Sequence, residues 1–253
     1  MRILAIMKEP AILYEDNDVL VINKPEGWMV HGDGKTENTP TVVEWFLCRE
    51  PAAAGVGEPG YSVKGEILDR SGIVHRLDRE TSGVLILAKH QAAYTFLKQQ
   101  FKDRNVYKEY RAFVYGRIHD RWGTINRPIG RSTKDHRLRS AMKGAKGMLR
   151  EAITDIERIG MGEYEGEAFS YLKLIPKTGR THQLRVHLRA IDRPIVQDEL
   201  YATHVIEKSN NLGLSRMALH AHQLELTLPN GQSERFIAPV PQAFEEAAER
   251  IAE

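Results

Sequence analysis

The sequence predicts an α+β fold with a mixed, largely antiparallel central sheet flanked by helices and loops. Two observations favour this class. Strand-like segments mix with segments at the helical period, without the regular strand–helix–strand order of a parallel sheet. Apolar residues make up 42% of the 253 residues and charged residues 28%, which is typical of a globular protein and excludes fibrous and disordered classes.

The chain is expected to form one domain over residues 1–253, with two lobes. Its start, MRILAIMKEPAILYEDND, lacks a long apolar region, so no signal peptide is expected. No apolar run approaches the ~20 residues that span a bilayer, so no membrane association is expected. The single cysteine, Cys48, cannot form an internal disulfide. We therefore expect a cytoplasmic protein, and a monomer because no large unexplained apolar face is evident.

The N-terminal part is predicted to contain two strands, a helix and a loop. Residues 11–24 (AILYEDNDVLVINK) have the pattern of two strands around an Asp/Asn turn. Residues 39–50 (TPTVVEWFLCRE) begin with threonine and proline and continue with apolar residues at helical spacing, which predicts a helix. Residues 51–66 are rich in Gly, Pro and Ala, which predicts an exposed loop.

The middle of the chain is predicted to alternate between strand, helix, strand and loop. Residues 83–90 (GVLILAKH) have the composition of a buried strand, and residues 91–105 follow the helical period. Residues 106–118 (VYKEYRAFVYGRI) are rich in β-forming residues and alternate, which predicts a strand. Residues 121–147 are basic, rich in turn residues and without periodicity, which predicts a long loop or hairpin.

The C-terminal part is predicted to complete the sheet and to add two helices. Residues 150–160, 169–179 and 222–229 are predicted strands. Residues 179–192 (GRTHQLRVHLRAID) are predicted to form an amphipathic helix, and residues 241–253 a C-terminal helix.

Charge is distributed unevenly along the chain. The net charge is only +2, yet residues 98–150 contain fifteen Lys and Arg against four Asp and Glu. An excess of this size indicates a surface that binds a polyanion. The alternative is a solvated basic face without a partner.

The first candidate for chemistry is Asp78 in residues 73–83 (IVHRLDRETSG), directly before the apolar run VLILA. A carboxylate in a cleft is a nucleophile or a general base when a nearby cation keeps it ionised. Arg76 and Arg79 flank this acid. The alternative is a salt bridge within the loop.

Two further segments carry candidate groups. In the predicted helix after Gly179, His182, Arg185 and Arg189 share one side, which suits an anionic ligand or a buried carboxylate. A metal site is not expected there, since no HExxH pattern accompanies the histidines. In the strand before residue 116, Tyr110 points away from its neighbours, and a tyrosine there is able to stack on a base or exchange a proton. Ordinary packing is the alternative.

Taken together, these segments resemble the RluA family of RNA pseudouridine synthases, in order and over nearly the whole chain. The motifs that carry the resemblance are VLVINKPEGWMVHG, HRLDRETSGVLILAK, KEYRAFVYG, KTGRTHQLRVHLRAIDRPIVQDELYA, MALHAHQLELTLP and FIAPVP. The resemblance starts near residue 12, so it implies the form without an N-terminal S4 domain. It also implies a catalytic cleft between the two lobes.

The resemblance implies roles for individual residues. Asp78 matches the essential aspartate, Tyr110 the tyrosine that packs on the target base, and Arg185 the arginine that pairs with the aspartate. Arg76 matches the arginine thought to fill the gap left by the flipped nucleotide. The same motifs imply that Lys24, Arg180 and His182 bind RNA. One departure is Gln197, where the family often has glycine before the aspartate.

The implied activity is the isomerisation of specific uridines in tRNA, ribosomal RNA or both to pseudouridine, without cofactor or metal. Two other hypotheses compete with it. A non-catalytic RNA-binding protein of the same fold would have lost Asp78 or Tyr110, and both are present. A metal-dependent nuclease or hydrolase using Asp78, Asp198 and the histidines would need clustered carboxylates, but arginines dominate the motifs.

Overall fold

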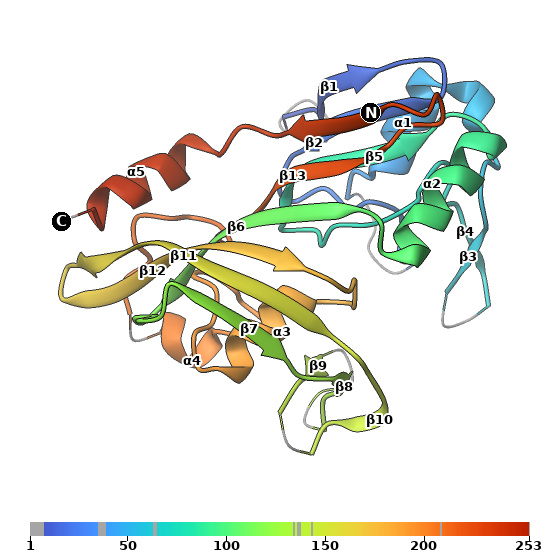
Figure 1. The fold of residues 1–253 in the computed structure, drawn as a ribbon. Coiled ribbons are helices and arrows are strands. Elements are labelled where there is room, and N and C mark those ends of the chain that lie inside the picture. Colours follow the sequence, from blue (N-terminus) through green and yellow to red (C-terminus); the bar gives the residue numbers. More distant parts are fainter. Residues whose placement is uncertain are drawn as a thin grey trace. The chain divides into compact units, whose positions relative to one another are not determined.

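The computed structural model describes residues 8–252, except 35–38, 63–64, 134, 136–137, 143 and 208. The chain divides into two compact units: Met1–Tyr107 with Ala221–Pro239, and Lys108–His220 with Val240–Glu253 (Figure 1). Each unit combines antiparallel strands with helices, which confirms the predicted α+β class. The single domain and the cleft between lobes stay predictions. Among the described residues, no helix is long and apolar enough to cross a membrane.

The first unit contains an antiparallel sheet with a wholly buried strand. Its strands are β1 (Ala11–Glu15), β2 (Val19–Lys24), β5 (Ser82–Ala88), β13 (Leu219–Thr227) and β14 (Ser233–Ile237). β2 pairs antiparallel with both β1 and β5, and β14 pairs antiparallel with β13. Every residue of β5 is buried, in agreement with the predicted buried strand.

Two helices of the first unit begin at side-chain caps. In α1 (Val42–Arg49), Thr41 Oγ1 accepts a hydrogen bond from Glu44 N, and the Glu44 carboxylate accepts one from Thr41 N. This capping box explains why the predicted helix starts after the threonine. α2 (Gln91–Asp103) buries an apolar face against the cluster that contains β5 residues Val84 and Ile86.

The predicted loop at residues 51–66 contains short regular elements. A 3-10 turn spans Pro51–Ala53, and a hairpin joins β3 (Gly60–Tyr61) to β4 (Ile67–Leu68). Tyr61 and Ile67 face each other across this hairpin and are exposed. Two-residue strands are too short to leave a periodic pattern in the sequence.

In the second unit, antiparallel strands follow the order β6-β12-β11-β7. They are β6 (Tyr107–Tyr115), β12 (Glu167–Pro176), β11 (Ile153–Tyr164) and β7 (Trp122–Asn126). The long β11–β12 hairpin turns at Glu165–Gly166, where both residues have positive φ as a tight hairpin turn requires. Three of these strands confirm predicted ones, whereas β7 lies within the predicted loop.

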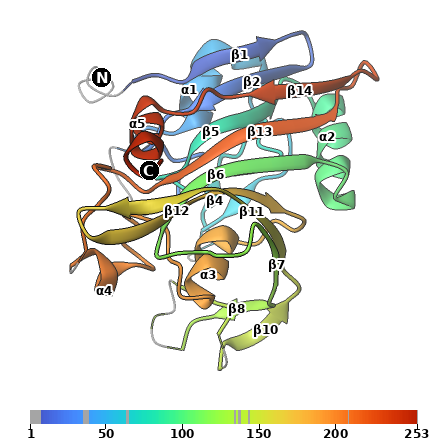
Figure 2. The ribbon, with the colours of Figure 1, turned by 60° about the vertical axis from the view of Figure 1, so that its left-hand side comes forward.

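Helices cover the apolar residues of these four strands. They are α3 (Gln183–Ala190), α4 (Thr203–Ile206) and α5 (Gln242–Arg250) (Figure 2). Leu184 and Leu188 of α3 and Phe244 of α5 belong to one apolar cluster around Phe113 of β6. The predictions of α3 and α5 are confirmed, and α4 is a single turn that was not predicted from the sequence.

The basic segment after β7 folds as a small sheet and not as an irregular loop. Its strands are β8 (Ile129–Arg131), β9 (Arg139–Ser140) and β10 (Lys146–Arg150), in the order β10-β8-β9. We call these strands the small basic sheet. All five residues of β10 are exposed, so the strand is held by backbone pairing to β8 more than by burial. A strand without a buried face lacks the alternating pattern that predicts strands.

Candidate active site

The segment just before Asp78 is held against β5. Ile73 forms a bridge to β5, and His75 Nε2 accepts a hydrogen bond from Ile86 N (3.2 Å). The His75 ring also stacks on Phe101, with 4.6 Å between ring centroids. Because Nε2 accepts, the ring proton lies on Nδ1. His75 therefore has a structural role in the loop that carries Asp78.

Lys24 holds the chain just after Asp78. Its Nζ donates hydrogen bonds to the carbonyl oxygens of Pro25 (2.8 Å), Trp28 (2.8 Å) and Arg79 (3.0 Å). The side chain is fully buried, and a buried ammonium needs such acceptors. From the sequence, Lys24 was expected to bind RNA, but its charge is not presented to solvent. In this geometry Lys24 supports the loop of Asp78.

Arg76 leaves the same loop and is exposed. Its NH1 lies 3.4 Å from Nε2 of the buried His31, whose Nδ1 lies 2.8 Å from the Gly32 carbonyl oxygen. A carbonyl accepts only, so Nδ1 carries the proton and Nε2 faces the guanidinium as an acceptor. Burial lowers the pKa of His31, and the charge of Arg76 lowers it further. His31 is thus neutral and helps to orient Arg76.

In the second unit, Tyr110 lies on β6, between Glu109 and Arg111. Glu109 is buried and pairs with Arg111 (2.8 Å) and with Lys173 of β12 (3.2 Å). Tyr110, half-buried, packs against the apolar cluster around Phe113. Alternation along β6 places Glu109 and Arg111 on one face of the strand and Tyr110 on the other.

Arg185 of α3 forms a buried bidentate ion pair with Asp198. Arg185 Nε lies 2.8 Å from Oδ2 and NH2 lies 2.7 Å from Oδ1. Asp198 Oδ1 also accepts hydrogen bonds from the backbone N–H groups of Leu200 and Tyr201 (3.1 Å each). The carboxylate is fully buried, so these four donors replace its hydration. The sequence patterns did not connect Asp198 to Arg185.

Tyr201 is a second residue that the sequence patterns did not single out. Its ring lies under the Arg185 guanidinium, with 5.1 Å between Arg185 Cζ and the ring centroid. Its hydroxyl lies 2.9 Å from His182 Nδ1. The only signal in the sequence is its position in the motif PIVQDELYA, three residues after Asp198.

The sequence-predicted site residues are divided between the units. Asp78, Arg76 and Lys24 belong to the first unit, whereas Tyr110, Arg185, Arg180 and His182 belong to the second. Arg180 Nε donates to the Glu151 carbonyl oxygen (2.9 Å), just after β10. The pairing of Asp78 with Arg185 stays a prediction. Among the described residues, no three His, Cys, Asp or Glu side chains form a group able to hold a metal.

The turn before Asp198 forms with Gln197 in a backbone conformation that normally favours glycine. The φ of Gln197 is +58°, in the left-handed region that glycine adopts at little cost. We predict that Gln197→Gly raises the free energy of unfolding by up to about 1 kcal/mol, since relief of about 1–2 kcal/mol of strain exceeds the added chain entropy. Urea unfolding measures the change, with Gln197→Ala as the control that keeps the strain. A glycine variant less stable than the alanine variant would contradict this.

A buried hydrogen-bonded chain attaches α3 to β11. Gln183 Nε2 donates to Thr154 Oγ1 (3.1 Å), and Gln183 Oε1 accepts from Thr178 Oγ1 (2.7 Å). His187 Nδ1 lies 2.9 Å from Thr154 Oγ1, and Nε2 lies 3.0 Å from the Arg127 carbonyl oxygen. That carbonyl accepts from Nε2–H, so Nδ1 accepts the Thr154 hydroxyl proton and the ring is neutral. This chain determines where α3, and with it Arg185, lies in the second unit.

Acid is expected to destabilise the protein through its buried neutral histidines. Burial lowers the pKa of both His187 and His31. Between the lowered folded pKa and the unfolded value near 6.5, the unfolded chain binds more protons. The free energy of unfolding should therefore fall as pH drops below about 7, by at most about 1.4 kcal/mol per pH unit for each histidine. Urea unfolding at several pH values measures the free energy of unfolding. In the His187→Asn variant this free energy should fall less steeply with decreasing pH. An equal slope would refute the assignment.

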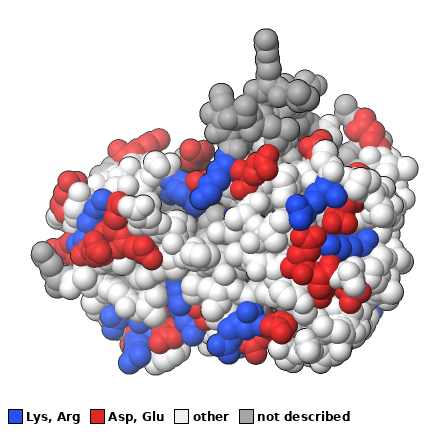
Figure 3. Space-filling model, turned by 90° about the horizontal axis from the view of Figure 1, so that it is seen from above, with Lys and Arg blue, Asp and Glu red and all other residues white. Residues whose placement is uncertain are grey.

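Basic side chains are paired with acidic ones on part of the surface and exposed on the small basic sheet. In the first unit, Glu15 pairs with both Arg49 and Lys89 (2.7 Å each). On the face drawn in Figure 3, basic and acidic side chains likewise lie interspersed. In the small basic sheet, by contrast, Lys146 and Arg150 are exposed on β10. The excess positive charge of residues 98–150 therefore includes a solvent-facing strand.

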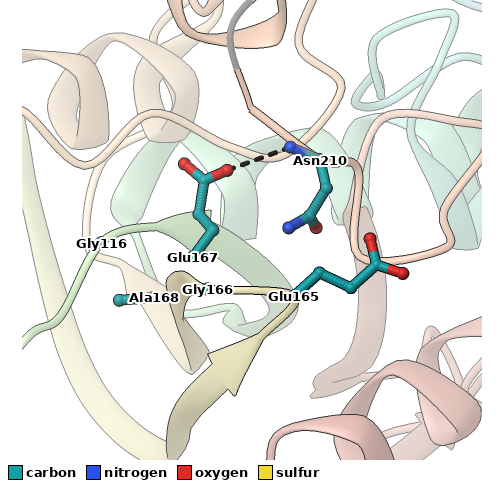
Figure 4. Close-up of a pocket in the computed structure, with 6 residues that line it drawn as sticks. All are labelled: Gly116, Glu165, Gly166, Glu167, Ala168 and Asn210. Carbon is teal, nitrogen blue, oxygen red and sulfur yellow. Dashed lines mark hydrogen bonds between the residues drawn. The ribbon is translucent and has the colours of Figure 1, made fainter.

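A surface pocket of about 580 Å³ lies elsewhere in the second unit (Figure 4). Its lining residues are Gly116, Glu165, Gly166, Glu167, Ala168 and Asn210. The Glu167 carboxylate accepts a hydrogen bond from Asn210 N (3.0 Å). Two carboxylates make this pocket unsuitable for phosphate groups, and it contains none of the predicted site residues.

The amino-acid sequence matches a known protein family and several of its members. A family model described as RNA pseudouridylate synthase matches residues 18–190. An uncharacterized RNA pseudouridine synthase from Synechocystis is 39% identical over 239 residues, which cover 92% of this chain and 66% of that protein. The ribosomal large subunit pseudouridine synthase D of Borreliella burgdorferi is 36% identical over 241 residues, with the same two coverages. This chain thus spans about two thirds of the length of these curated relatives.

A solved structure agrees with the fold. The human protein named RNA Pseudouridylate Synthase Domain Containing 1 superposes with a TM-score of 0.70 at 29% sequence identity. The match covers 92% of this chain and 84% of the human chain. It supports the α+β class that the sequence predicts.

Proposed function

The chain belongs to the RNA pseudouridylate synthase family, and we propose that it isomerises uridine in RNA to pseudouridine with Asp78 as the essential acid group. The reaction breaks the N1–C1′ bond of uridine, turns the base and rejoins it through C5. The proposed substrates are tRNA, ribosomal RNA or both, and one relative is named as a ribosomal large subunit enzyme. We further propose a cytoplasmic monomer that uses no cofactor.

One observation carries the proposal: Asp78 is half-buried on a loop that is held on both sides. His75 ties the loop to β5 on one side, and Lys24 binds the Arg79 carbonyl on the other. Holding a reacting group in place before the substrate arrives lowers the entropic part of the barrier. A carboxylate with only a surface role would not require a buried lysine under its loop.

The remaining residues are proposed to act around Asp78. Arg185 keeps the carboxylate ionised, because an unpaired, desolvated acid has a raised pKa. Tyr110 stacks on the target base, which must leave its helix or loop at a cost of a few kcal/mol. Arg76 fills the gap that the base leaves, and Arg180 and His182 bind phosphate groups together with the small basic sheet.

Release of tritium from RNA labelled at uridine C5 tests the proposal, since the new C–C bond displaces the C5 hydrogen. The substrate is RNA that has never been modified: transcripts of ribosomal and transfer RNA, and total RNA from a strain that lacks the gene. We expect release from at least one of these RNAs. No release from any of them would refute the proposed activity. Mapping pseudouridines in the deletion strain against its parent would then identify the site.

A further inference from the structure

We propose that Tyr201 is a positioning residue that couples the small basic sheet to Arg185. The proposal rests on the proposed function, in which the sheet binds RNA and Arg185 serves the reaction. All the contacts that support it lie within the second unit.

The hydroxyl of Tyr201 holds the small basic sheet. Its oxygen accepts a hydrogen bond from the backbone N–H of Arg139 in β9 (3.0 Å). β9 pairs with β8, where Arg131 lies opposite Arg139. Tyr201 also shares a buried apolar cluster with Ile129 of β8. The sheet has few buried residues, so these contacts fix much of its position.

The ring and backbone of Tyr201 support the Arg185–Asp198 pair. The ring lies under the guanidinium, where a cation is attracted to an aromatic face. The backbone N–H donates to Asp198 Oδ1 (3.1 Å). Tyr201 therefore contacts both members of the ion pair. Its side chain is buried, so water screens these interactions little.

The same hydroxyl also fixes the start of α3. It lies 2.9 Å from Nδ1 of His182, whose φ of +56° is in the left-handed region. A non-glycine residue adopts that conformation at a cost, so contacts elsewhere must offset it. One arrangement of protons satisfies both polar contacts: the Arg139 N–H donates to the hydroxyl oxygen, and the hydroxyl donates to His182 Nδ1.

These contacts make Tyr201 the common partner of a proposed RNA-binding strand and a proposed catalytic arginine. Phosphate groups bound by the small basic sheet would restrain β9 and, through the hydroxyl, the ring under Arg185. The two halves of the side chain have separable effects. The hydroxyl serves the sheet and His182, whereas the ring serves Arg185.

Two substitutions separate these effects. Tyr201→Phe keeps the ring under Arg185 and removes the hydroxyl, whereas Tyr201→Leu removes both. Binding is measured by fluorescence anisotropy with a fluorescein-labelled stem–loop RNA of arbitrary sequence at 50 and 200 mM salt. Turnover is measured by tritium release from the RNA that the wild-type protein modifies. Tyr164→Phe is the matched control, because Tyr164 also lies under an arginine, Arg250, in the same unit.

We expect Tyr201→Phe to weaken stem–loop binding about three- to tenfold, the effect of losing the hydrogen bond that holds β9. The plot of log affinity against log salt concentration should become less steep, by the amount that corresponds to about one phosphate contact. KM should rise, while kcat should fall by less than about threefold. Tyr201→Leu should also lower kcat at least about tenfold. Thermal unfolding checks that each variant is folded, and Tyr164→Phe should match the wild type.

The proposal would be overturned if Tyr201→Phe bound RNA with the affinity and the salt dependence of the wild type. A defect of Tyr201→Phe confined to kcat would overturn it as well, as would equal kcat values for the two Tyr201 variants. These outcomes differ from a failure of the proposed function. In that case the wild type releases no tritium, while the binding experiment still decides whether the hydroxyl controls the small basic sheet.

Discussion

Asp78→Asn is expected to abolish pseudouridine formation while leaving RNA binding intact. The amide has the shape of the carboxylate but neither its charge nor its ability to attack or to take a proton. Loss of a nucleophile or general base lowers turnover by at least about 10³-fold. Because Lys24 and His75 hold the loop from outside the carboxylate, the substitution should not move the backbone. Tritium release measures turnover, and anisotropy with labelled RNA measures binding.

Glu80→Gln is the matched control for Asp78→Asn. Glu80 lies two residues further along the same loop and pairs on the surface with Arg79 (2.6 Å). Removing its charge changes the loop's net charge by the same amount as Asp78→Asn does. Exposed pairs of this kind contribute little to stability. Turnover by Asp78→Asn within tenfold of the wild type, or equal losses in both variants, would show that Asp78 is not the reacting group.

Gly83→Ala is expected to destabilise the protein severely, although it adds only one methyl group. Gly83, in the TSG sequence after Asp78, has a φ of +117°. A Cβ there would lie 2.1 Å from the Ala221 carbonyl oxygen and 2.7 Å from the Ala221 C and N atoms. These are backbone atoms of β13, so relief requires separating β5 from β13. We expect a loss of more than about 3 kcal/mol in the free energy of unfolding, or failure to fold.

Gly123→Ala provides the comparison. Gly123 also lies in a strand, β7, but a Cβ there meets nothing within 4 Å and its φ is not in the left-handed region. The free energy of unfolding of Gly123→Ala should differ from that of the wild type by less than about 1 kcal/mol. Urea unfolding of both variants, or the soluble yield where Gly83→Ala does not fold, measures the difference. Equal stabilities would mean that β5 and β13 do not approach as closely as described.

Local patterns predicted the elements that bury apolar side chains. The apolar run in residues 84–88 predicts β5, and the helical spacing after His90 predicts α2. The Thr41–Glu44 capping box is visible in the sequence because its two partners are three residues apart. Where no face is buried, as in β10, the sequence carries no periodic pattern, and the segment of the small basic sheet was predicted only as a long loop or hairpin.

Partners of buried charges were not predictable in this way. Lys24 resembles a surface lysine in the sequence, yet its acceptors include the carbonyl of Arg79, 55 residues away. Arg185 and Asp198 are thirteen residues apart and meet only because the chain turns back after α3. A charge leaves water only when the fold supplies compensating groups, and no local pattern records where they come from.

Short motifs and local periodicity were enough to predict the family, the fold class and Asp78 as the candidate acid. Three contacts became visible only in the folded chain: Lys24 supports the Asp78 loop, Arg185 pairs with Asp198, and Tyr201 lies between that pair and the small basic sheet. The physical reason is that these contacts join segments far apart in the chain, and packing of the complete units selects them.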